Sequence, residues 1–553
     1  MTHFQEMLVR HETEILRILK TQILDAQDKH FGAFMEADGH IDTRHCGFLL
    51  SHLAVGYLIP QCRYYHDASL KTAIENSFCF LFSHHRPSGC LDLTSCNFDS
   101  APDTAFTMNS MINAWWLLEK DSNDEVQWLR SPMKKLIEIC CEGVMNGGFH
   151  TPNHRWAISA CLKHAALICG RDDFSRKADL YLGEGLDIDE NGEFAERSTG
   201  TYNAVNDDQM IRLYLATGNM MYLKAARSNL EMMLSYLDPD GSVFTFNSTR
   251  QDYGQKVWPD QYYILFLLVG FLMDDPKFAA YSEFMWEMST AHGITPSGLA
   301  WLVRFPDLEA FGKQVPADLC PISRYSHVYS ASGIGRWKRG SLSVTAMAYK
   351  PNFLYVQNDS MNLCVSLYGN VCDKRNFVAD RIEPTEDGCR LSCRLDSWYY
   401  LPFEGNGPDT SDWWKMDNAL TRQKQIRAFL DLSVQIHVAE NAVSLIFSAE
   451  GLDCVPLRLE LGFTPGTLRG EQFLMDAFPG GEMTVSGGAI EISDHSGHCL
   501  TVSPCFASHN VRNRMIGAYP KAEDRFTVYL TCTSPCTRQI TIGTTPMFPS
   551  SLS

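Results

Sequence analysis

The first 320 residues carry apolar side chains at the three- and four-residue spacing of helices with one buried face. The spacing is clearest in Met7-Leu8-Ile15-Leu16-Leu19-Ile23, Phe48-Leu49-Leu53-Tyr57-Leu58 and Met108-Met111-Ile112-Trp115-Leu118. Further helices are predicted near 125–145, 156–170, 206–217, 220–237, 260–272 and 276–290, with polar breaks such as Asp238-Pro239-Asp240-Gly241 between them. Paired helices without the regular sequence period of a solenoid predict an α/α toroid, either incomplete or of six hairpins.

From about residue 320 the pattern changes to the two-residue alternation of strands. Residues 341–349 and 457–463 alternate, residues 443–447 and 526–530 are rich in β-formers, and glycine turns follow Pro479 and Ser486. This pattern predicts an antiparallel β-sandwich. We therefore expect a toroid domain over 1–320 and a sandwich domain over 321–553, with the boundary in the stretch from Pro316 to Pro321.

Composition narrows the class of protein. Hydrophobic residues make up 45% and charged residues 20% of the chain, which is typical of a globular protein. A net charge of −18 without a basic patch argues against nucleic acid as a partner. The charged N-terminus lacks the apolar core of a secretory signal, and no apolar stretch is long enough to span a membrane. The 19 cysteines, with no CxxC pair, indicate reduced thiols, so we expect a cytoplasmic protein.

Three polar clusters in the helical half contain candidate chemistry. They are Gly147–Trp156 (GGFHTPNHRW), Asp189–Asn203 (DENGEFAERSTGTYN) and Asn97–Phe106 (NFDSAPDTAF). Each also has a purely structural explanation. Asn153 can cap a helix beside a buried His154, Tyr202 can belong to the core, and Asp103 can sit in the first turn of a helix.

The first two clusters together resemble the catalytic segments of heparinase II/III-like and related alginate lyases. In those enzymes an Asn-His pair ends a loop of an α/α toroid, and a segment like D-G-x-x-x-E-x-S-x-x-Y follows. Here His154 and Tyr202 are 48 positions apart, and Gly192, Glu196 and Ser198 keep the order of the pattern. Asn191 stands where the Asp would be, and Tyr202 comes one residue late. The resemblance extends to the architecture, because those families place a β-sandwich after the toroid.

The resemblance implies β-elimination on a uronic acid in an acidic oligo- or polysaccharide. Abstraction of the C5 proton requires that the neighbouring carboxylate be neutralised, a role implied for Asn153 with help from Arg155. His154 and Tyr202 would share the roles of base and acid, while Glu196 and Ser198 position the loop. The remaining candidates for substrate binding are His150, Trp156, Trp258 and, from the β region, His327. Enzymes of this kind often form dimers, so a homodimer is a further expectation. The missing secretory signal favours short oligosaccharides imported into the cell, and therefore action at chain ends.

Two other functions stay open. A uronic-acid hydrolase on the same scaffold would use paired carboxylates. Carboxylates are available at Asp103, Glu193, Glu196, Asp207 and Asp208, and Trp156, Trp258 and Tyr202 could stack on sugars. The third hypothesis is a glycan-binding protein without activity, or another toroid enzyme such as an epimerase.

No cofactor is expected, since the chain has neither a dinucleotide-binding nor a P-loop glycine motif. Some relatives hold a structural zinc in the sandwich. The residues available for a metal here are His327, His437, His495, His498 and Asp494. Their spacing matches no zinc signature, so we expect no catalytic metal.

Overall fold

The computed structural model describes residues 1–314, 323–405 and 407–548. Contacts divide the chain into two compact units. The helical unit comprises Met1–Tyr236 and Gly241–Pro321, and the sandwich unit comprises Leu237–Asp240 and Ile322–Ser553. The boundary predicted at 320 lies outside the described residues.

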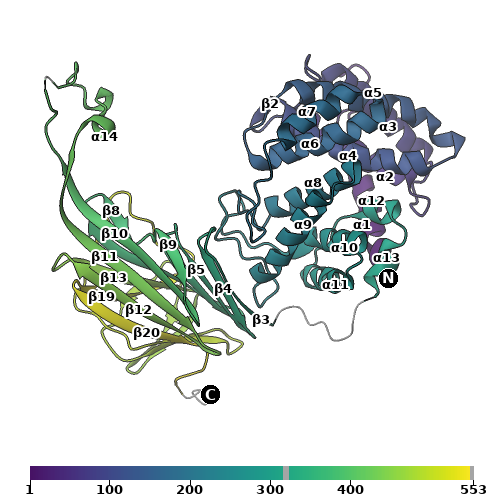
Figure 1. The fold of residues 1–553 in the computed structure, drawn as a ribbon. Helices are drawn as coiled ribbons and strands as arrows, with labels where there is room; N and C mark the ends of the chain where they lie inside the picture. Colours follow the sequence, from purple (N-terminus) through teal and green to yellow (C-terminus); the bar gives the residue numbers. More distant parts are fainter. Residues whose placement is uncertain (315–322, 406, 549–553) are drawn as a thin grey trace. The chain divides into compact units, whose positions relative to one another are not determined.

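The helical unit is a succession of helical hairpins (Figure 1). Its helices are α1 His3–Leu19, α2 Thr43–Leu58, α3 Ala68–His84, α4 Ala101–Lys120, α5 Gln127–Asn146, α6 Pro152–Cys169, α7 Asp172–Leu182, α8 Tyr202–Thr217, α9 Met220–Met233, α10 Tyr262–Met273, α11 Pro276–Ala291, α12 Leu299–Arg304 and α13 Leu308–Gly312. Short 3-10 turns (Asp124–Val126, Leu234–Tyr236, Pro259–Gln261) and a hairpin of β1 Leu91–Leu93 and β2 Asn97–Ser100 complete it. Helices α2, α4, α6, α8 and α10 contact one another in that order, and each packs on the helix that follows it. This is the predicted α/α toroid, with five hairpins in the described residues.

Burial separates the inner helices from the outer ones. In α10 every residue from Tyr262 to Gly270 is buried, which explains why its sequence is apolar on all sides. The outer helix α7 buries only Phe174 and Ala178. The inner helix α10 therefore belongs to the core of the unit, whereas the outer helix α7 contributes little to it.

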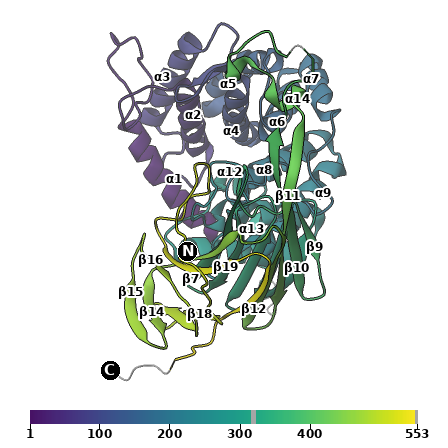
Figure 2. The same ribbon diagram turned by 90° about the vertical axis from the view of Figure 1, so that its left-hand side faces the viewer.

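The sandwich unit consists of two nine-stranded sheets (Figure 2). Sheet A has the order β16-β19-β13-β7-β6-β5-β4-β3, and β8 also pairs with β7. Its strands are β3 Arg324–Tyr329, β4 Ile334–Arg339, β5 Leu342–Met347, β6 Asn352–Asn358, β7 Met361–Val371, β8 Lys374–Asn376, β13 Pro456–Phe463, β16 Glu482–Thr484 and β19 Phe526–Thr533. Only the β16–β19 pair is parallel among these described strands.

Sheet B has the order β15-β14-β17-β18-β20-β12-β11-β10-β9, and its named pairs are antiparallel. Its strands are β9 Arg381–Pro384, β10 Gly388–Tyr400, β11 Lys424–Val438, β12 Ala442–Gly451, β14 Gly466–Gly470, β15 Phe473–Ala477, β17 Ile490–Ser493, β18 Cys499–Ser503 and β20 Cys536–Gly543. The segment between β10 and β11 holds a 3-10 turn at Trp413–Lys415 and the short helix α14, Asn418–Thr421. The predicted sandwich is thereby confirmed.

Strict alternation along the central strands of sheet B builds one core between the sheets. In β11 the buried side chains of Leu430, Leu432, Val434 and Ile436 alternate with half-buried polar ones. Because successive side chains of a strand point to opposite faces, the same alternation lines the outer face of the sheet with polar groups.

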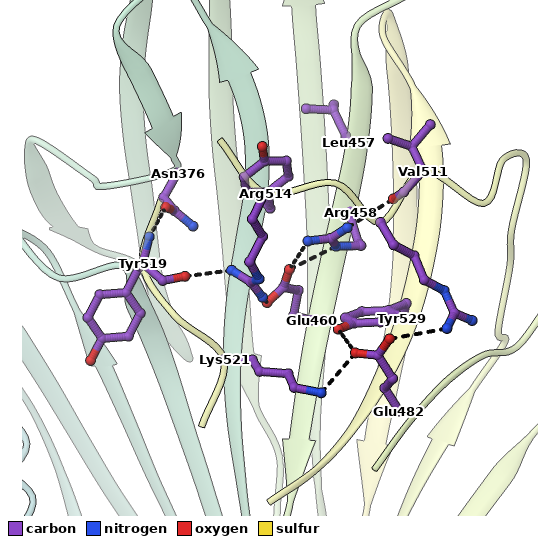
Figure 3. Close-up of polar contacts among 12 residues, drawn as sticks. Asn376, Leu457, Arg458, Glu460, Glu482, Val511, Arg514, Tyr519, Lys521 and Tyr529 are labelled. Atoms are coloured by element: carbon purple, nitrogen blue, oxygen red, sulfur yellow. Dashed lines mark hydrogen bonds and ion pairs between the residues drawn. The ribbon is translucent and has the colours of Figure 1, made fainter. Parts of the chain in front are cut away.

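The buried Arg458 binds the irregular segment between β18 and β19 to sheet A (Figure 3). Arg458 of β13 is 2% exposed, and its guanidinium lies 4.8 Å from the ring centres of both Tyr368 and Tyr529. Its Nε donates to Glu460 at 2.8 Å, and Arg514, from the segment between β18 and β19, pairs with the other oxygen of that carboxylate. A buried cation is tolerated there because it is paired and hydrogen-bonded.

Candidate active site

The first turns of three inner helices contain the residues that the sequence singled out. Asp103 lies in the first turn of α4, Asn153 and His154 lie in that of α6, and Tyr202 is the first residue of α8. Glu196 belongs to the loop before α8. Hydrogen bonds, an ion pair and ring contacts link these segments.

Asn153 and Glu196 form a buried pair that joins the first two clusters. Asn153 is fully buried and Glu196 is 5% exposed. The Glu196 carboxylate accepts the backbone N–H of Asn153 at 2.9 Å, and both of its oxygens lie 2.8 Å from Asn153 Nδ2. Burial raises the pKa of Glu196, and the hydrogen bonds from Asn153 work in the opposite direction. The carboxyl group is thus held at the start of α6 and favours the protonated form more than an ordinary glutamate does.

Arg250 connects this pair to Tyr202. Its Nε lies 3.3 Å from Glu196 Oε1, and its guanidinium lies 4.8 Å from the centre of the Tyr202 ring. The Arg250 side chain is about a quarter exposed, so the cation reaches the edge of the site. Arg250 was in none of the three clusters, and it places a positive charge beside Glu196 and Tyr202.

His154 lies beside this cation with one nitrogen unsatisfied. Its ring centre is 4.7 Å from that of His150 and 6.0 Å from that of Phe106. Among the described residues its buried Nδ1 has no hydrogen-bond partner. Burial and the nearby charges of His150 and Arg250 lower the pKa of His154 to about 4, against an opposing effect of Asp103. The imidazole is therefore neutral near pH 7 and able to accept a proton.

A buried carboxylate shapes the loop that leads into Tyr202. Asp252 accepts the Ser198 hydroxyl at 2.8 Å and the Gly200 N–H at 2.9 Å, and Ser198 Oγ in turn accepts the Tyr202 N–H at 3.0 Å. A Cβ at Gly200 would lie 2.9 Å from the carboxylate, so the close approach requires glycine. Ser198 is fully buried, which makes it a support of the loop rather than a ligand contact. Within the described residues the Tyr202 hydroxyl has no hydrogen bond.

Asp103 is held by its own loop. It is 4% exposed and accepts hydrogen bonds from Asn97 Nδ2 at 2.9 Å and from the Ser100 hydroxyl at 2.6 Å. Arg44 Nε lies 3.2 Å from its other oxygen. Its charge acts on His154, which places it at the same end of the inner helices. These contacts start α4 and leave the carboxylate closely surrounded.

Two candidates next to the Asn-His pair serve the packing of α6. The guanidinium of Arg155 binds Glu184 at 2.8 Å and lies 4.2 Å from the centre of the Trp156 ring. Trp156 is fully buried. The expectation that Trp156 stacks on a sugar is therefore not met, and Arg155 is already engaged by a carboxylate instead of supporting Asn153.

Two further candidates have aromatic partners of their own. The ring of Trp258 stacks on His292 at 3.4 Å between centres. His327 belongs to the sandwich unit, where it is exposed on β3 with its ring centre 4.4 Å from that of Tyr329. Neither contact links these residues to Asn153 or Tyr202.

The other carboxylates named for a hydrolase lie inside the helical unit. Asp207 is fully buried on α8 without a hydrogen-bond partner among the described residues, and burial raises its pKa well above the ordinary value. Asp208 binds Arg212 at 2.6 Å, and the buried Glu193 accepts the Tyr236 hydroxyl at 3.2 Å.

The residues considered for a structural metal have separate partners. His437 pairs with Asp387 at 2.7 Å, and His498 lies 3.2 Å from Asp494. In the described ranges no three His, Cys, Asp or Glu side chains are arranged to hold a metal ion.

No protein-family model and no curated protein matches the sequence. Solved structures match the fold over almost the whole chain. A xanthan lyase from Paenibacillus has a TM-score of 0.59 at 8% identity, covering 99% of this chain and 57% of its own. Chondroitin AC lyase of Streptomyces coelicolor A3, in complex with chondroitin sulphate, has a TM-score of 0.58 at 12% identity, covering 97% and 79%. A heparan sulfate lyase mutant from Pedobacter heparinus has a TM-score of 0.54 at 11% identity, covering 97% and 82%.

The chain shares the fold of these polysaccharide lyases. The sequence predicted this fold from its periodicity and from two short motifs, and that prediction is confirmed. The chain spans little more than half the length of the xanthan lyase. No helix of the described residues is both long and apolar enough to cross a membrane.

Proposed function

We propose that this chain cleaves a uronic-acid-containing glycan by β-elimination at the site around Asn153. The observation that carries the proposal is the continuous set of contacts from Asn153 through Glu196 and Arg250 to Tyr202, with the neutral His154 beside it. It combines an amide, a cation, a base and an unpaired hydroxyl. Elimination from a uronate needs a group that neutralises the carboxylate, a base and a proton donor, and these four groups can supply all three.

Neutralisation of the substrate carboxylate falls to Asn153 and Arg250. In the structure the Asn153 amide donates inward, to Glu196 and to the Thr151 hydroxyl, while its buried Oδ1 has no donor among the described residues. The raised pKa of Glu196 offers a simple rearrangement. If Glu196 holds a proton, a half-turn of the amide lets Glu196 donate to Oδ1 and releases Nδ2 from the Glu196 carboxyl group, so that Nδ2 can donate to another acceptor. Glu196 is then a positioning residue that acts through Asn153.

His154 and Tyr202 would move the protons. With its pKa lowered to about 4, His154 is unprotonated at neutral pH and can take the C5 proton. The Tyr202 hydroxyl can then donate to the leaving glycosidic oxygen. The reverse assignment uses the same two groups. We therefore assign the pair of roles to the pair of residues.

Hydrolysis is the second candidate, and one observation favours it. Glu196 is buried with a raised pKa, as a general acid of a glycosidase requires. Asp103 would then act as its partner, although that carboxylate already has three contacts.

The test compares products on unsulfated and sulfated uronate oligosaccharides. Elimination leaves a C4–C5 double bond conjugated to the carboxylate, which absorbs in the ultraviolet. We expect Tyr202→Phe to reduce the appearance of this absorbance by at least about a hundredfold, since one proton transfer contributes roughly that much. Tyr214→Phe, on the same helix, is the matched control and should keep full activity. Reducing ends released without the absorbance would instead identify a hydrolase, and glycan binding without turnover would identify a binding protein.

A further inference from the structure

The outer face of sheet B has a polar hollow of about 400 Å³, formed entirely by the sandwich unit. It lies over β9, β10, β11 and β12. Alternation along β10 buries Leu391 and Cys393 and turns Arg390, Ser392 and Arg394 outward. In the register of the sheet Ser392 lies opposite Ser433, and Arg394 lies opposite Asp431. The hollow therefore offers guanidinium, hydroxyl and carboxylate groups side by side.

Charge pairing leaves one guanidinium of the hollow available. Arg381 binds Glu383 at 2.9 Å, and Arg394 binds Asp431 through two hydrogen bonds of 2.7 and 2.6 Å. Arg390 is exposed and has no partner among the described residues. Glu383 faces it in the register but is taken by Arg381. The hollow also contains the carboxylates of Asp380 and Glu450. A fitting ligand therefore has one anionic group for Arg390 and several hydrogen-bond donors for these carboxylates.

We propose that this hollow binds one uronate unit of a glycan, with the carboxylate on Arg390. The choice of a uronate rests on the function proposed above; the site lies on the other unit and is a binding site only. An arginine fork matches a carboxylate with two parallel hydrogen bonds. The volume of the hollow is within the range of small-molecule sites, and the polar lining of the hollow suits a ligand rich in hydroxyl groups.

The rest of the lining fits the remainder of such a sugar. The hydroxyls of Ser433 and Ser448 can donate or accept, and the carboxylates of Asp431 and Glu450 accept from sugar hydroxyls. Phe429 is 41% exposed and carries the Arg394 guanidinium 4.3 Å from its ring centre, so it adds an apolar surface next to the hollow. The acidic groups of the lining oppose a densely sulfated chain, and they favour a saccharide of low charge density.

The experiment uses the full chain in a Tyr202→Phe background, so that the probe is not consumed. The probe is an unsulfated tetrasaccharide that contains glucuronate, titrated by calorimetry. We expect two classes of site, of which Arg390→Gln weakens one by about tenfold to a hundredfold, the loss expected for a charge-assisted pair. Arg427→Gln, an exposed arginine on β11 outside the hollow, is the matched control and should change affinity less than twofold.

The outcomes separate this inference from the proposed function. If the chain turns over no uronate glycan but Arg390→Gln still removes a binding event, the proposed reaction fails and the hollow remains a uronate site. Unchanged binding in Arg390→Gln would overturn the inference even in an active lyase. It would also be overturned if neutral cellotetraose, or a heparin tetrasaccharide of the same length, bound through Arg390 at least as tightly as the unsulfated probe.

Discussion

Replacing Glu196 tests the buried pair at the centre of the site. Glu196→Ala leaves the backbone N–H and the Nδ2 group of Asn153 without their acceptor, and both are buried. Each unpaired buried donor costs about 1–3 kcal/mol, so we expect a loss of roughly 2–6 kcal/mol in the free energy of unfolding. Glu196→Gln retains one acceptor oxygen and the shape of the side chain. Its expected cost is about 1–2 kcal/mol.

The stability difference between Glu196→Gln and the parent protein should change with pH in a definite direction. Burial raises the pKa of Glu196, so the folded protein keeps this proton to a higher pH than the unfolded chain does. The stability that the group contributes is complete below its unfolded pKa of about 4.3 and is lost as the pH rises through the raised value. Glutamine does not titrate. Relative to the parent, Glu196→Gln should therefore gain stability as the pH rises across this window, by about 1.4 kcal/mol for each pH unit.

Urea unfolding at several pH values, with kcat/KM measured alongside, checks both statements. The control pair is Glu184→Ala and Glu184→Gln, at a carboxylate that binds Arg155 from a half-exposed position. The reasoning is refuted if Glu196→Ala costs no more than Glu184→Ala. It is equally refuted if the difference between Glu196→Gln and the parent stays constant or moves against the variant as the pH rises.

Three further predictions concern buried charges elsewhere. Asp207 has a strongly raised pKa and no partner in the described residues, so Asp207→Asn should match the parent near pH 4 and become the more stable protein as the pH rises, in urea unfolding at each pH. Asp252→Ala removes the acceptor of the Ser198 hydroxyl and should cost about 2–3 kcal/mol and lower kcat, measured by unfolding and product absorbance. Arg458→Met breaks a buried ion pair and should lower the free energy of unfolding by about 3–5 kcal/mol, measured by hydrogen exchange of the β13 amides. A smaller loss would mean that Arg514 alone is a sufficient partner for Glu460.

Local pattern predicted the elements better than their pairing. Helix α10 and strand β12 were predictable, because burial on all sides or on one face places apolar residues at regular intervals along the sequence. The outer helix α7 buries two residues, Phe174 and Ala178, which is too short a stripe to stand out from its polar neighbours. The helix start at Pro102 was predicted, but the small hairpin of β1 and β2 before it was not, because its strands are only three and four residues long. Hairpin order around the toroid depends on contacts between elements, which no window of sequence contains.

Residues of the candidate site that belong to a sequence motif were predictable. Residues that reach the site only through folding were not. Asn153, Glu196 and Tyr202 belong to two recognisable segments. Arg250 and Asp252 lie in a polar stretch between helices, with no periodicity to suggest that one of them is buried. Their roles follow from the contacts with Glu196 and Ser198, more than fifty positions away along the chain.

Helical geometry explains why Trp156 is buried and not available to stack on a sugar. Residues three apart lie on the same face of a helix, so Trp156 shares a face with Asn153. Asn153 can be buried against Glu196 only if that face packs into the protein, and Trp156 must then be buried with it. His154, one position on from Asn153, is turned by about 100° around the helix and keeps a small exposed fraction beside His150. The same rotation thus places His154 at the edge of the candidate site and Trp156 in the interior of the helical unit.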